Sequence, residues 1–257
     1  MARVALVTGA ARGIGAATVT ALVADGWRVV AVDRCADDPD VAYALGTRAE
    51  LDALASDVVV TAVADTRDAA ALENAVAAAE ARWGGLDAAI AVAGVIAGGV
   101  PAWELPLEQE RAVLDIDLGG VLTLARVAVP ALLRRPSPRR GRFVAVASAA
   151  ATRGLPMLAA YCAAKAGVTG FVRALAVELR GTGITANAVS PGSTSTAILD
   201  ESARLYALPD AQAFATQQPL DRLLRPDEVA AAIAFLVGDG GSGITGAAVP
   251  VDGGLSV

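Results

Sequence analysis

The sequence predicts a doubly wound α/β domain, with a parallel sheet of about seven strands and helices on both faces. Short apolar runs rich in valine and alanine alternate with longer amphipathic segments along the whole chain. The first apolar run leads directly into a glycine-rich turn, which is typical of sheets of this class. No linker, repeat or low-complexity stretch divides the 257 residues, so we expect a single domain over residues 1–257.

Seven apolar runs have the length of buried strands. They are Val4–Thr8, Arg28–Asp33, Val58–Ala64, Ala88–Ala93, Arg142–Ser148, Ile184–Ser190 and Ala247–Val251. Five longer segments are predicted to be helical, and they are Gly13–Asp25, Ala69–Arg82, Leu107–Leu133, Ala159–Leu179 and Asp227–Val237. Because a strand–helix–strand unit forms a right-handed crossover, the alternation predicts parallel pairing with both faces covered.

The composition excludes several classes of function. The formal net charge of −6 argues against a nucleic-acid partner, which would require a basic surface. Glycine, proline, serine and threonine interrupt the long uncharged stretches, so we expect neither a membrane-spanning helix nor a membrane partner. The N-terminal apolar run is too short for a secretory signal, and two separated cysteines form no disulfide framework. We therefore expect a cytoplasmic protein.

Two residue types are unusually scarce. The chain contains no histidine, which excludes histidine-based triads and most zinc sites, and we expect no bound metal. Lys165 is the single lysine, because the other 20 of the 21 basic residues are arginine. Lysine and arginine are not equivalent where a compact ammonium with an adjustable pKa is needed. The position of this one lysine therefore helps to test whether a motif that contains it is functional.

A glycine-rich turn follows the first predicted strand. Its sequence is Thr8-Gly9-Ala-Ala-Arg12-Gly13-Ile14-Gly15, and the first predicted helix begins within it. Glycines allow a close approach to a pyrophosphate, and the helix N-terminus offers free N–H groups and the positive end of its dipole. The spacing Gly-x-x-x-Gly-x-Gly is a variant of the usual dinucleotide fingerprint, and an ordinary tight turn is the alternative.

Asp33 ends the second predicted strand, 18 residues after Gly15. A carboxylate at this place can accept hydrogen bonds from the adenosine ribose and repel a 2′-phosphate, which favours NAD(H) over NADP(H). Arg12 and Arg34 lie near enough in sequence to bind such a phosphate instead. We expect the repulsion by Asp33 to dominate.

Tyr161 and Lys165 are spaced i, i+4 on a predicted helix and therefore share one face. A free tyrosine has a pKa of about 10, and a neighbouring ammonium favours its phenolate. Such a pair can take a proton from an alcohol or return one to an alkoxide. Ser148 ends a buried strand 13 residues before Tyr161, where its hydroxyl can hold the substrate oxygen. A turn or capping serine is the alternative.

Five motifs, in this order and spacing, resemble the short-chain dehydrogenase/reductase family over essentially the whole chain. They are Thr8-Gly-x-x-x-Gly-x-Gly15, Asp33, Ser148, Tyr161-x-x-x-Lys165 and Asn187-Ala-Val-Ser-Pro191-Gly192. The resemblance implies a Rossmann-like, NAD(P)-binding domain. It also implies that Ser148 polarises the carbonyl and that Tyr161 is the general acid/base. Lys165 would bind the nicotinamide ribose and lower the Tyr161 pKa.

The resemblance also implies the remaining cofactor contacts. Pro191, Gly192 and Thr194 would line the nicotinamide side, and Asp65 and Thr66 would line the adenine. The full cofactor-binding set is Gly9, Arg12, Gly13, Ile14, Gly15, Asp33, Arg34, Asp65, Thr66, Ala93, Gly94, Tyr161, Lys165, Pro191, Gly192, Thr194 and Thr196.

Two departures from the family pattern concern asparagines. The fourth predicted strand ends in Ala91-Val92-Ala93-Gly94, where the family has Asn-Asn-Ala-Gly. Asp117 stands where the family has an asparagine that helps to hold a water in a proton relay from the lysine. We expect the relay to survive and include Asp117 among the catalytic residues. An extra carboxylate can, alternatively, raise the Lys165 pKa and weaken its effect on Tyr161.

The segment Asp33–Leu51 is predicted to be a loop at a place where family members usually begin another helix. It is similar to an insert in actinobacterial members associated with the redox peptide cofactor mycofactocin, which hold NAD so tightly that it does not exchange. The resemblance implies tightly bound NAD and a mycofactocin-type electron acceptor. A slightly longer loop without a role is the alternative.

The residues expected around the substrate are mostly apolar, with Ser193–Pro219 as a mobile lid. They are Val95, Ile96, Leu155, Pro156, Met157, Leu158, Ile198, Leu199, Leu205, Tyr206 and Phe214. Ordinary packing is the alternative. The expected function is NAD(H)-dependent interconversion of an apolar secondary alcohol and its ketone.

Two other functions stay open. NADPH-dependent reduction of a 3-oxoacyl-type ketone is disfavoured by Asp33. A non-catalytic nucleotide-binding homologue is disfavoured by the intact Ser148, Tyr161 and Lys165. Family members are usually tetramers or dimers, so a homo-oligomer, either tetramer or dimer, is also expected, with the Ala-rich face of Ala159–Leu179 suited to an interface.

Overall fold

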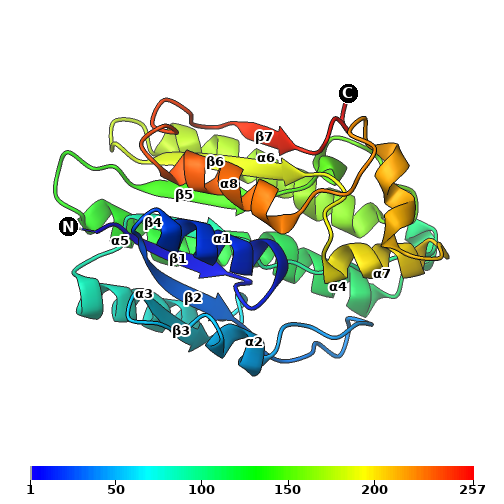
Figure 1. Ribbon diagram of the computed structural model, residues 1–257, viewed down its shortest axis with the longest axis horizontal. Helices are drawn as coiled ribbons and strands as arrows, with labels where there is room; N and C mark the ends of the chain where they lie inside the picture. Colours follow the sequence, from blue (N-terminus) through cyan, green and yellow to red (C-terminus); the bar gives the residue numbers. More distant parts are fainter. Residues whose placement is uncertain (1) are drawn as a thin grey trace.

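Seven strands pair in the order β3-β2-β1-β4-β5-β6-β7, and every pair is parallel. The computed structural model describes residues 2–257 (Figure 1). The strands are β1 (Val4–Thr8), β2 (Arg28–Asp33), β3 (Val59–Val63), β4 (Ala88–Ala91), β5 (Arg142–Val146), β6 (Thr185–Pro191) and β7 (Ala248–Val251). The predicted seven-stranded parallel sheet is confirmed.

Helices cover both faces of the sheet (Figure 1). The helices are α1 (Gly13–Ala24), α2 (Arg48–Asp52), α3 (Ala69–Trp83), α4 (Leu107–Leu114), α5 (Gly120–Arg134), α6 (Ala159–Glu178), α7 (Ala197–Leu205) and α8 (Pro226–Val237). One apolar cluster joins α1 and α8 to the sheet, and another joins α3, α5 and α6 to it. Leu6 belongs to one cluster and its neighbour Val7 to the other, because successive strand residues point to opposite faces.

The predicted helix over Leu107–Leu133 is present and extends to Arg134, but it is not α-helical throughout. A π-helical turn, Asp115–Gly119, separates α4 from α5 and turns the Asp117 side chain into the interior, where it has no exposed area. Such turns inside helices often occur at functional sites. Gly120 permits the close packing that follows, since a Cβ there would lie 2.6 Å from the Thr66 hydroxyl.

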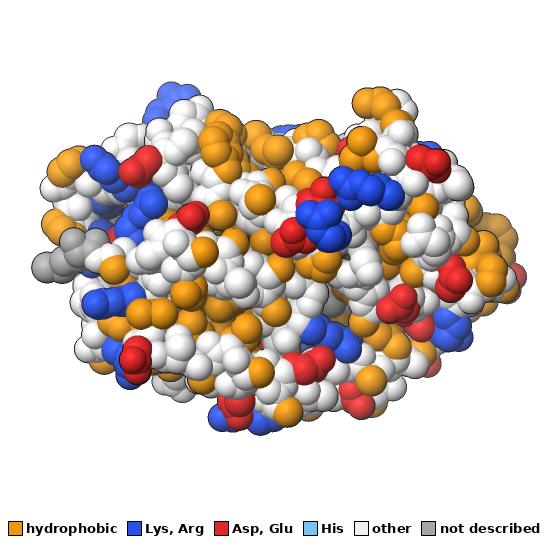
Figure 2. All heavy atoms as spheres, viewed as in Figure 1, with side chains coloured by type: hydrophobic (Ala, Val, Ile, Leu, Met, Phe, Trp, Pro, Cys, Tyr) orange, Lys and Arg blue, Asp and Glu red, His pale blue; other side chains and the backbone are white. Residues whose placement is uncertain are grey.

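The stretch Leu107–Arg134 has a mean hydropathy of 1.7 and is long enough to cross a membrane. Its apolar residues, among them Leu124 and Leu132, lie in the core beneath the sheet. The apolar composition is therefore explained by packing. On the face drawn in Figure 2, acidic and basic side chains are interspersed among hydrophobic ones.

The strand order places a crevice at the centre of the sheet. β1 pairs with β2 on one side and with β4 on the other. The connection after β1 therefore leads toward one edge of the sheet, and the connection after β4 leads toward the opposite edge. Ligands of open parallel sheets bind outside the carboxyl ends of the strands at such a point.

Two connections over this crevice contain more structure than predicted. The segment Asp33–Leu51 ends in α2, which begins at a capping box formed by Thr47 and Glu50. The segment Ser193–Pro219 contains α7 and a 3₁₀ turn, Ala211–Gln217. Its ends are joined through Gln218, whose side chain accepts a hydrogen bond from the Ser193 amide (2.8 Å).

Candidate active site

A cavity of about 860 Å³ opens at the carboxyl ends of the strands. Every residue predicted to bind the cofactor lines this cavity, and so do Ser148, Tyr161 and Lys165. Asp117 does not line it but contacts Lys165 at the cavity wall. The fold therefore brings together the predicted catalytic and cofactor-binding residues.

The glycine-rich turn presents bare backbone to the cavity at the N-terminus of α1. Gly9 and Gly13 have φ values of 66° and 57°, a region that disfavours other residues. A Cβ on Gly15 would lie 1.9 Å from the carbonyl oxygen of Gly9. Each glycine is thus required by the conformation of the turn, which leaves the first N–H groups of α1 free for an anion.

Asp33 is held at the end of β2 by two backbone amides. Its Oδ2 accepts a hydrogen bond from Ala11 (3.0 Å), and its Oδ1 accepts one from Cys35 (3.1 Å). Gly46, from the far end of the following loop, packs against the same carboxylate. A Cβ on Gly46 would lie 3.1 Å from Asp33 Oδ1 and 2.8 Å from the Ala11 Cβ. The loop can approach Asp33 this closely only because residue 46 is glycine.

The loop after β2, residues 34–47, folds back toward the glycine-rich turn. Arg12 Nη2 donates a hydrogen bond to the Ala44 carbonyl (2.6 Å), and the Leu45 amide donates one to Asp37 (2.8 Å). Tyr43, Leu45 and Gly46 line the cavity. The loop therefore covers the end of the cavity at Asp33, where the adenosine half of a dinucleotide is expected, and this end is called the adenosine side below.

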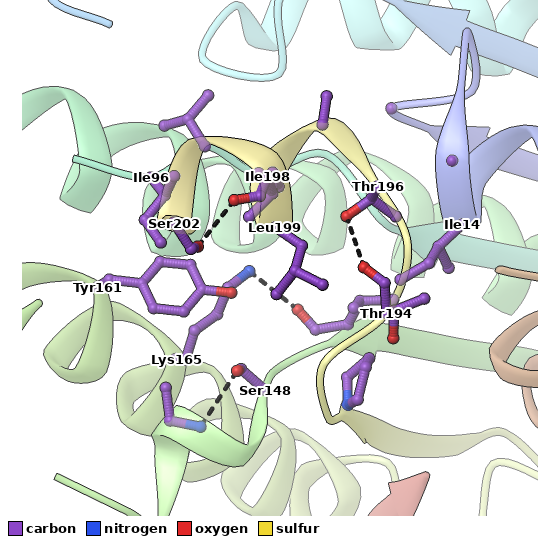
Figure 3. Close-up of a pocket in the computed structure, with 18 of the residues that line it drawn as sticks. Ile14, Ile96, Ser148, Tyr161, Lys165, Thr194, Thr196, Ile198, Leu199 and Ser202 are labelled. Atoms are coloured by element: carbon purple, nitrogen blue, oxygen red, sulfur yellow. Dashed lines mark hydrogen bonds between the residues drawn. The ribbon is translucent and has the colours of Figure 1, made fainter. Parts of the chain in front are cut away.

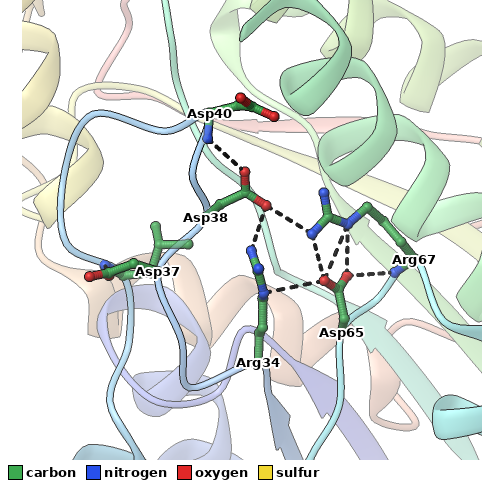
Figure 4. Close-up of polar contacts among 7 residues, drawn as sticks. Arg34, Asp37, Asp38, Asp40, Asp65 and Arg67 are labelled. Atoms are coloured by element: carbon green, nitrogen blue, oxygen red, sulfur yellow. Dashed lines mark hydrogen bonds and ion pairs between the residues drawn. The ribbon is translucent and has the colours of Figure 1, made fainter. Parts of the chain in front are cut away.

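Four charged side chains hold the base of this loop (Figure 4). Asp38 is buried and pairs with Arg34 (2.5 Å) and Arg67 (2.8 Å). Asp65 pairs with the same two guanidinium groups, at 3.3 Å from Arg34 and 2.6 Å from Arg67. The loop is thus tied to the segment that follows β3.

Ser148, Tyr161 and Lys165 converge at the other end of the cavity (Figure 3). Ser148 follows β5, and its hydroxyl accepts a hydrogen bond from the Ala150 amide (3.1 Å). Tyr161 and Lys165 lie on the first turns of α6, and the Lys165 ammonium is 5.5 Å from the centroid of the Tyr161 ring. The predicted i, i+4 pairing on one helix face is confirmed.

Asp117 forms a buried ion pair with Lys165. Lys165 Nζ lies 3.1 Å from Asp117 Oδ2 and donates a hydrogen bond to the Val146 carbonyl (3.2 Å). Asp117 Oδ1 accepts a hydrogen bond from the Val95 amide (2.7 Å). The carboxylate therefore links the lysine to the segment after β4.

Comparisons with known proteins agree with this arrangement. A family profile described as enoyl-(acyl carrier protein) reductase matches residues 9–256. Cis-4-hydroxycyclohexanecarboxylate dehydrogenase of Sinomonas cyclohexanicum is 41% identical, over 99% of this chain and 96% of the relative. (−)-Trans-carveol dehydrogenase of Rhodococcus erythropolis is 35% identical, over 99% of this chain and 98% of the relative. The crystal structure of a Mycobacterium avium carveol dehydrogenase in complex with NAD superposes with a TM-score of 0.92 at 32% identity, covering 98% of this chain and 97% of that one.

The chain belongs to the short-chain dehydrogenase/reductase family. It is an oxidoreductase that acts on CH–OH groups with NAD as its cofactor. The predictions of family, fold and reaction class are confirmed.

The residues of this dehydrogenase fit NAD. The glycine-rich turn presents backbone to the cavity at the N-terminus of α1, where a pyrophosphate can bind, and the Asp33 carboxylate lines the same cavity, where it can accept hydrogen bonds from a ribose. Arg34, which could have received a 2′-phosphate, is instead ion-paired with Asp38 and Asp65. The polar groups along the cavity thus match a dinucleotide without that phosphate.

Burial is the largest single influence on the pKa of Tyr161 and on that of Lys165. It raises the pKa of Tyr161, and the Asp117 charge adds to this, while the Lys165 charge and the Ser148 hydroxyl work to lower it. Burial works to lower the pKa of Lys165, but Asp117 and Tyr161 together outweigh it and hold this pKa above its ordinary value. Lys165 thus works to lower the Tyr161 pKa, as predicted, but burial raises this pKa by more.

The substrate side of the cavity is apolar, as predicted. Its wall is formed by Val95, Ile96, Leu155, Pro156, Leu158, Ile198, Leu199, Tyr206, Leu208 and Phe214. Two of the predicted residues, Met157 and Leu205, do not line it. Met157 has a φ of 61° and its carbonyl accepts a hydrogen bond from the Gly99 amide, and Leu205 packs against the same glycine. Both residues thus contact Gly99 and not the cavity.

Two features of the cavity were not predicted from sequence patterns. Tyr43, Leu45 and Gly46 belong to the loop after β2, and the spacing of Thr47 and Glu50 as a capping box could have indicated that this loop is anchored. Arg153 lines the substrate side and donates a hydrogen bond to the Leu255 carbonyl. No sequence signal marks Arg153.

Proposed function

We propose that this dehydrogenase oxidises ring-bearing, largely apolar secondary alcohols to ketones and reduces the corresponding ketones. The observation that carries the proposal is the convergence of Ser148, Tyr161 and Lys165 at the apolar end of a cavity whose other end fits NAD. The named relatives support the ring, since one acts on a hydroxycyclohexane carboxylate and others on carveol.

In this proposal Tyr161 removes the hydroxyl proton of the alcohol and returns it in the reverse reaction. The Ser148 hydroxyl holds the substrate oxygen near Tyr161. The Lys165 ammonium stabilises the phenolate, and Asp117 is a positioning residue that keeps this ammonium in place. Bound NAD supplies the hydride acceptor, so the alcohol loses one hydride and one proton in total.

We also propose that substrates with a carboxylate are favoured. Arg153 and Lys165 are the cationic side chains on the substrate side of the cavity among residues 2–257. Lys165 pairs with Asp117, whereas no carboxylate of that part of the chain pairs with Arg153. An unpaired guanidinium beside an apolar wall can bind a carboxylate through two hydrogen bonds. The 41% identical relative acts on such a compound.

We further propose that NAD is held tightly and that a mycofactocin-type acceptor reoxidises it. The support is the anchored loop, in which Arg12 binds Ala44 and Gly46 packs on Asp33. The four charged side chains Arg34, Asp38, Asp65 and Arg67 brace the same loop. An adenosine moiety bound beneath the loop could leave only after some of these contacts had broken.

The proposal also includes an oligomeric state and a cellular location. A homo-oligomer, tetramer or dimer, would cover the apolar side chains exposed on α5 and α6, such as Leu122 (38% exposed) and Val177 (65%). A cytoplasmic location would suit two free cysteines and an NAD-linked reaction.

The first experiment denatures freshly purified protein and identifies the released nucleotide by chromatography and mass spectrometry. Stoichiometric NAD or NADH supports retention, and turnover should then require an artificial electron acceptor. Empty protein contradicts retention, and turnover should follow addition of free NAD to a cyclic alcohol. If neither condition gives turnover of cis-4-hydroxycyclohexanecarboxylate, carveol or cyclohexanol, the proposed substrate class is wrong.

A further inference from the structure

Arg34 occupies a place from which a cation could recognise NADP. It follows Asp33 directly and lines the adenosine side of the cavity. A guanidinium beside the adenosine ribose can bind a 2′-phosphate by paired hydrogen bonds. What the Arg34 side chain contacts therefore bears on the choice between the two cofactors.

The guanidinium of Arg34 is already occupied. Its Nη1 lies 2.5 Å from Asp38 Oδ2, and its Nε lies 3.3 Å from Asp65 Oδ2 (Figure 4). Asp38 is 4% exposed, and it also accepts hydrogen bonds from Arg67 (2.8 Å) and from the Asp40 amide (3.1 Å). The Asp38 carboxylate is thus a fixed, buried partner for Arg34.

The formal charges of this group sum to zero. Arg34 and Arg67 carry two positive charges, and Asp38 and Asp65 carry two negative ones. Burial works to raise the pKa of Asp38, but the Asp40 amide and the two guanidinium groups outweigh it and hold this pKa below its ordinary value. Asp38 is therefore ionised at neutral pH, and the group offers no excess positive charge to a phosphate.

We propose that Asp38 is a cofactor-specificity residue, which keeps Arg34 from binding the 2′-phosphate of NADP. The proposal rests on the proposed role of Asp33 at the adenosine ribose and adds a second barrier to it. Asp33 repels the phosphate directly, and Asp38 removes the cation that would otherwise attract it. Removal of Asp33 alone leaves the second barrier intact.

The test compares three variants: Asp33→Ser, Asp33→Ser/Asp38→Asn, and the control Asp33→Ser/Asp40→Asn. Asp40 lies two residues from Asp38 on the same loop, and its carboxylate contacts neither arginine. The first readout is the ratio of kcat/KM with NADP to that with NAD. The second is the NADP:NAD ratio recovered from denatured protein, which reports selectivity even if the cofactor does not exchange.

We expect the Asp38→Asn change to raise both ratios by about tenfold or more over Asp33→Ser, as one freed charged hydrogen bond allows. The Asp40→Asn control should match Asp33→Ser. Adding Arg34→Leu to the Asp38→Asn double variant should abolish the gain. Equal ratios in the three variants would overturn the proposal, and so would a gain that survives Arg34→Leu.

Two further measurements distinguish failure of the proposal from misfolding of a variant. Asp33→Ser/Asp38→Glu retains the charge and should stay as poor with NADP as Asp33→Ser, so a gain there would contradict the role of charge even if Asp38→Asn fails to fold. Thermal unfolding of each variant reports folding directly. An Asp33→Ser variant with unchanged affinity for NAD would instead refute the role of Asp33 at the ribose.

Discussion

The Lys165 ammonium and the Asp117 carboxylate form an ion pair of 3.1 Å in which the side chains are only 4% and 0% exposed. The π-helical turn between α4 and α5 carries Asp117, while α6 carries Lys165. Each group also has a backbone partner, Val95 for the aspartate and Val146 for the lysine. A charge at position 117 thus acts on the lysine that lies beside Tyr161.

Replacing Asp117 by Asn should shift the pH dependence of alcohol oxidation to lower pH. Tyr161 must lose its proton to act as a base, and the Asp117 charge adds to the burial that raises its pKa. Without that charge the phenolate forms at lower pH, provided that the buried Lys165 remains protonated. The check is kcat/KM for oxidation from about pH 6 to about pH 11, a range that extends above the ordinary tyrosine pKa of about 10.

An unchanged or alkaline-shifted profile would contradict the electrostatic role of Asp117. A large rise in turnover with an unchanged pH profile would also show that Asp117 takes no part in the proton relay. Thermal unfolding is the control, because loss of a partner for a buried charge destabilises a protein whatever its catalytic role.

Replacing Tyr161 by Phe should reduce turnover by about 10²- to 10⁴-fold, the usual contribution of a positioned acid/base. The ring remains, so packing around α6 and retention of nucleotide should be preserved. The measurement is steady-state turnover alongside the nucleotide content of the purified variant. Turnover within threefold of the parent (about 0.6 kcal/mol) would refute the acid/base assignment.

Replacing Arg153 by Gln should weaken binding of carboxylate-bearing substrates selectively. We expect the KM for cis-4-hydroxycyclohexanecarboxylate to rise about fivefold, the effect of a partly exposed ion pair of roughly 1 kcal/mol, with little change for cyclohexanol. Arg173→Gln, on the outer surface of α6, removes the same charge at another place and is the matched control. An equal effect on both substrates would show that Arg153 only ties its loop to Leu255.

Replacing Gly46 by Ala should loosen the loop over the adenosine side. The new Cβ would meet the Ala11 Cβ at 2.8 Å and Asp33 at 3.1 Å, so the loop must move away. Overpacking of this kind costs about 1–3 kcal/mol, which corresponds to roughly tenfold or more in the dissociation rate of NAD. Release is measured by fluorescence or by dialysis against labelled NAD.

Gly243→Ala provides the comparison for the loop variant, because nothing lies within 4 Å of a Cβ there and it is far from residue 46 in sequence. This variant should release NAD at the parental rate. If Gly46→Ala does the same, the loop does not retain the cofactor.

Local patterns in the sequence were sufficient for the sheet and for most of the site. The alternation of buried runs and amphipathic segments predicts the strands, because hydrophobic periodicity reflects which faces an element buries. The glycine-rich turn and the Tyr161–Lys165 spacing predict their own geometry, since both are set within a few residues of backbone. The position of Asp33 at the end of β2 follows in the same way.

Tertiary structure alone decided which partners these residues meet. Arg34 could have remained free for a phosphate, but folding brings Asp65, 31 residues away, to within 3.3 Å of it. Asp117 is turned inward by a π-helical turn that the apolar pattern of Leu107–Leu133 conceals. Such contacts depend on packing between segments distant in the chain, and local periodicity holds no information about that packing. The sequence therefore determined the fold and its reaction chemistry, whereas the three-dimensional packing decided the charge balance around the cofactor and the shape of the substrate pocket.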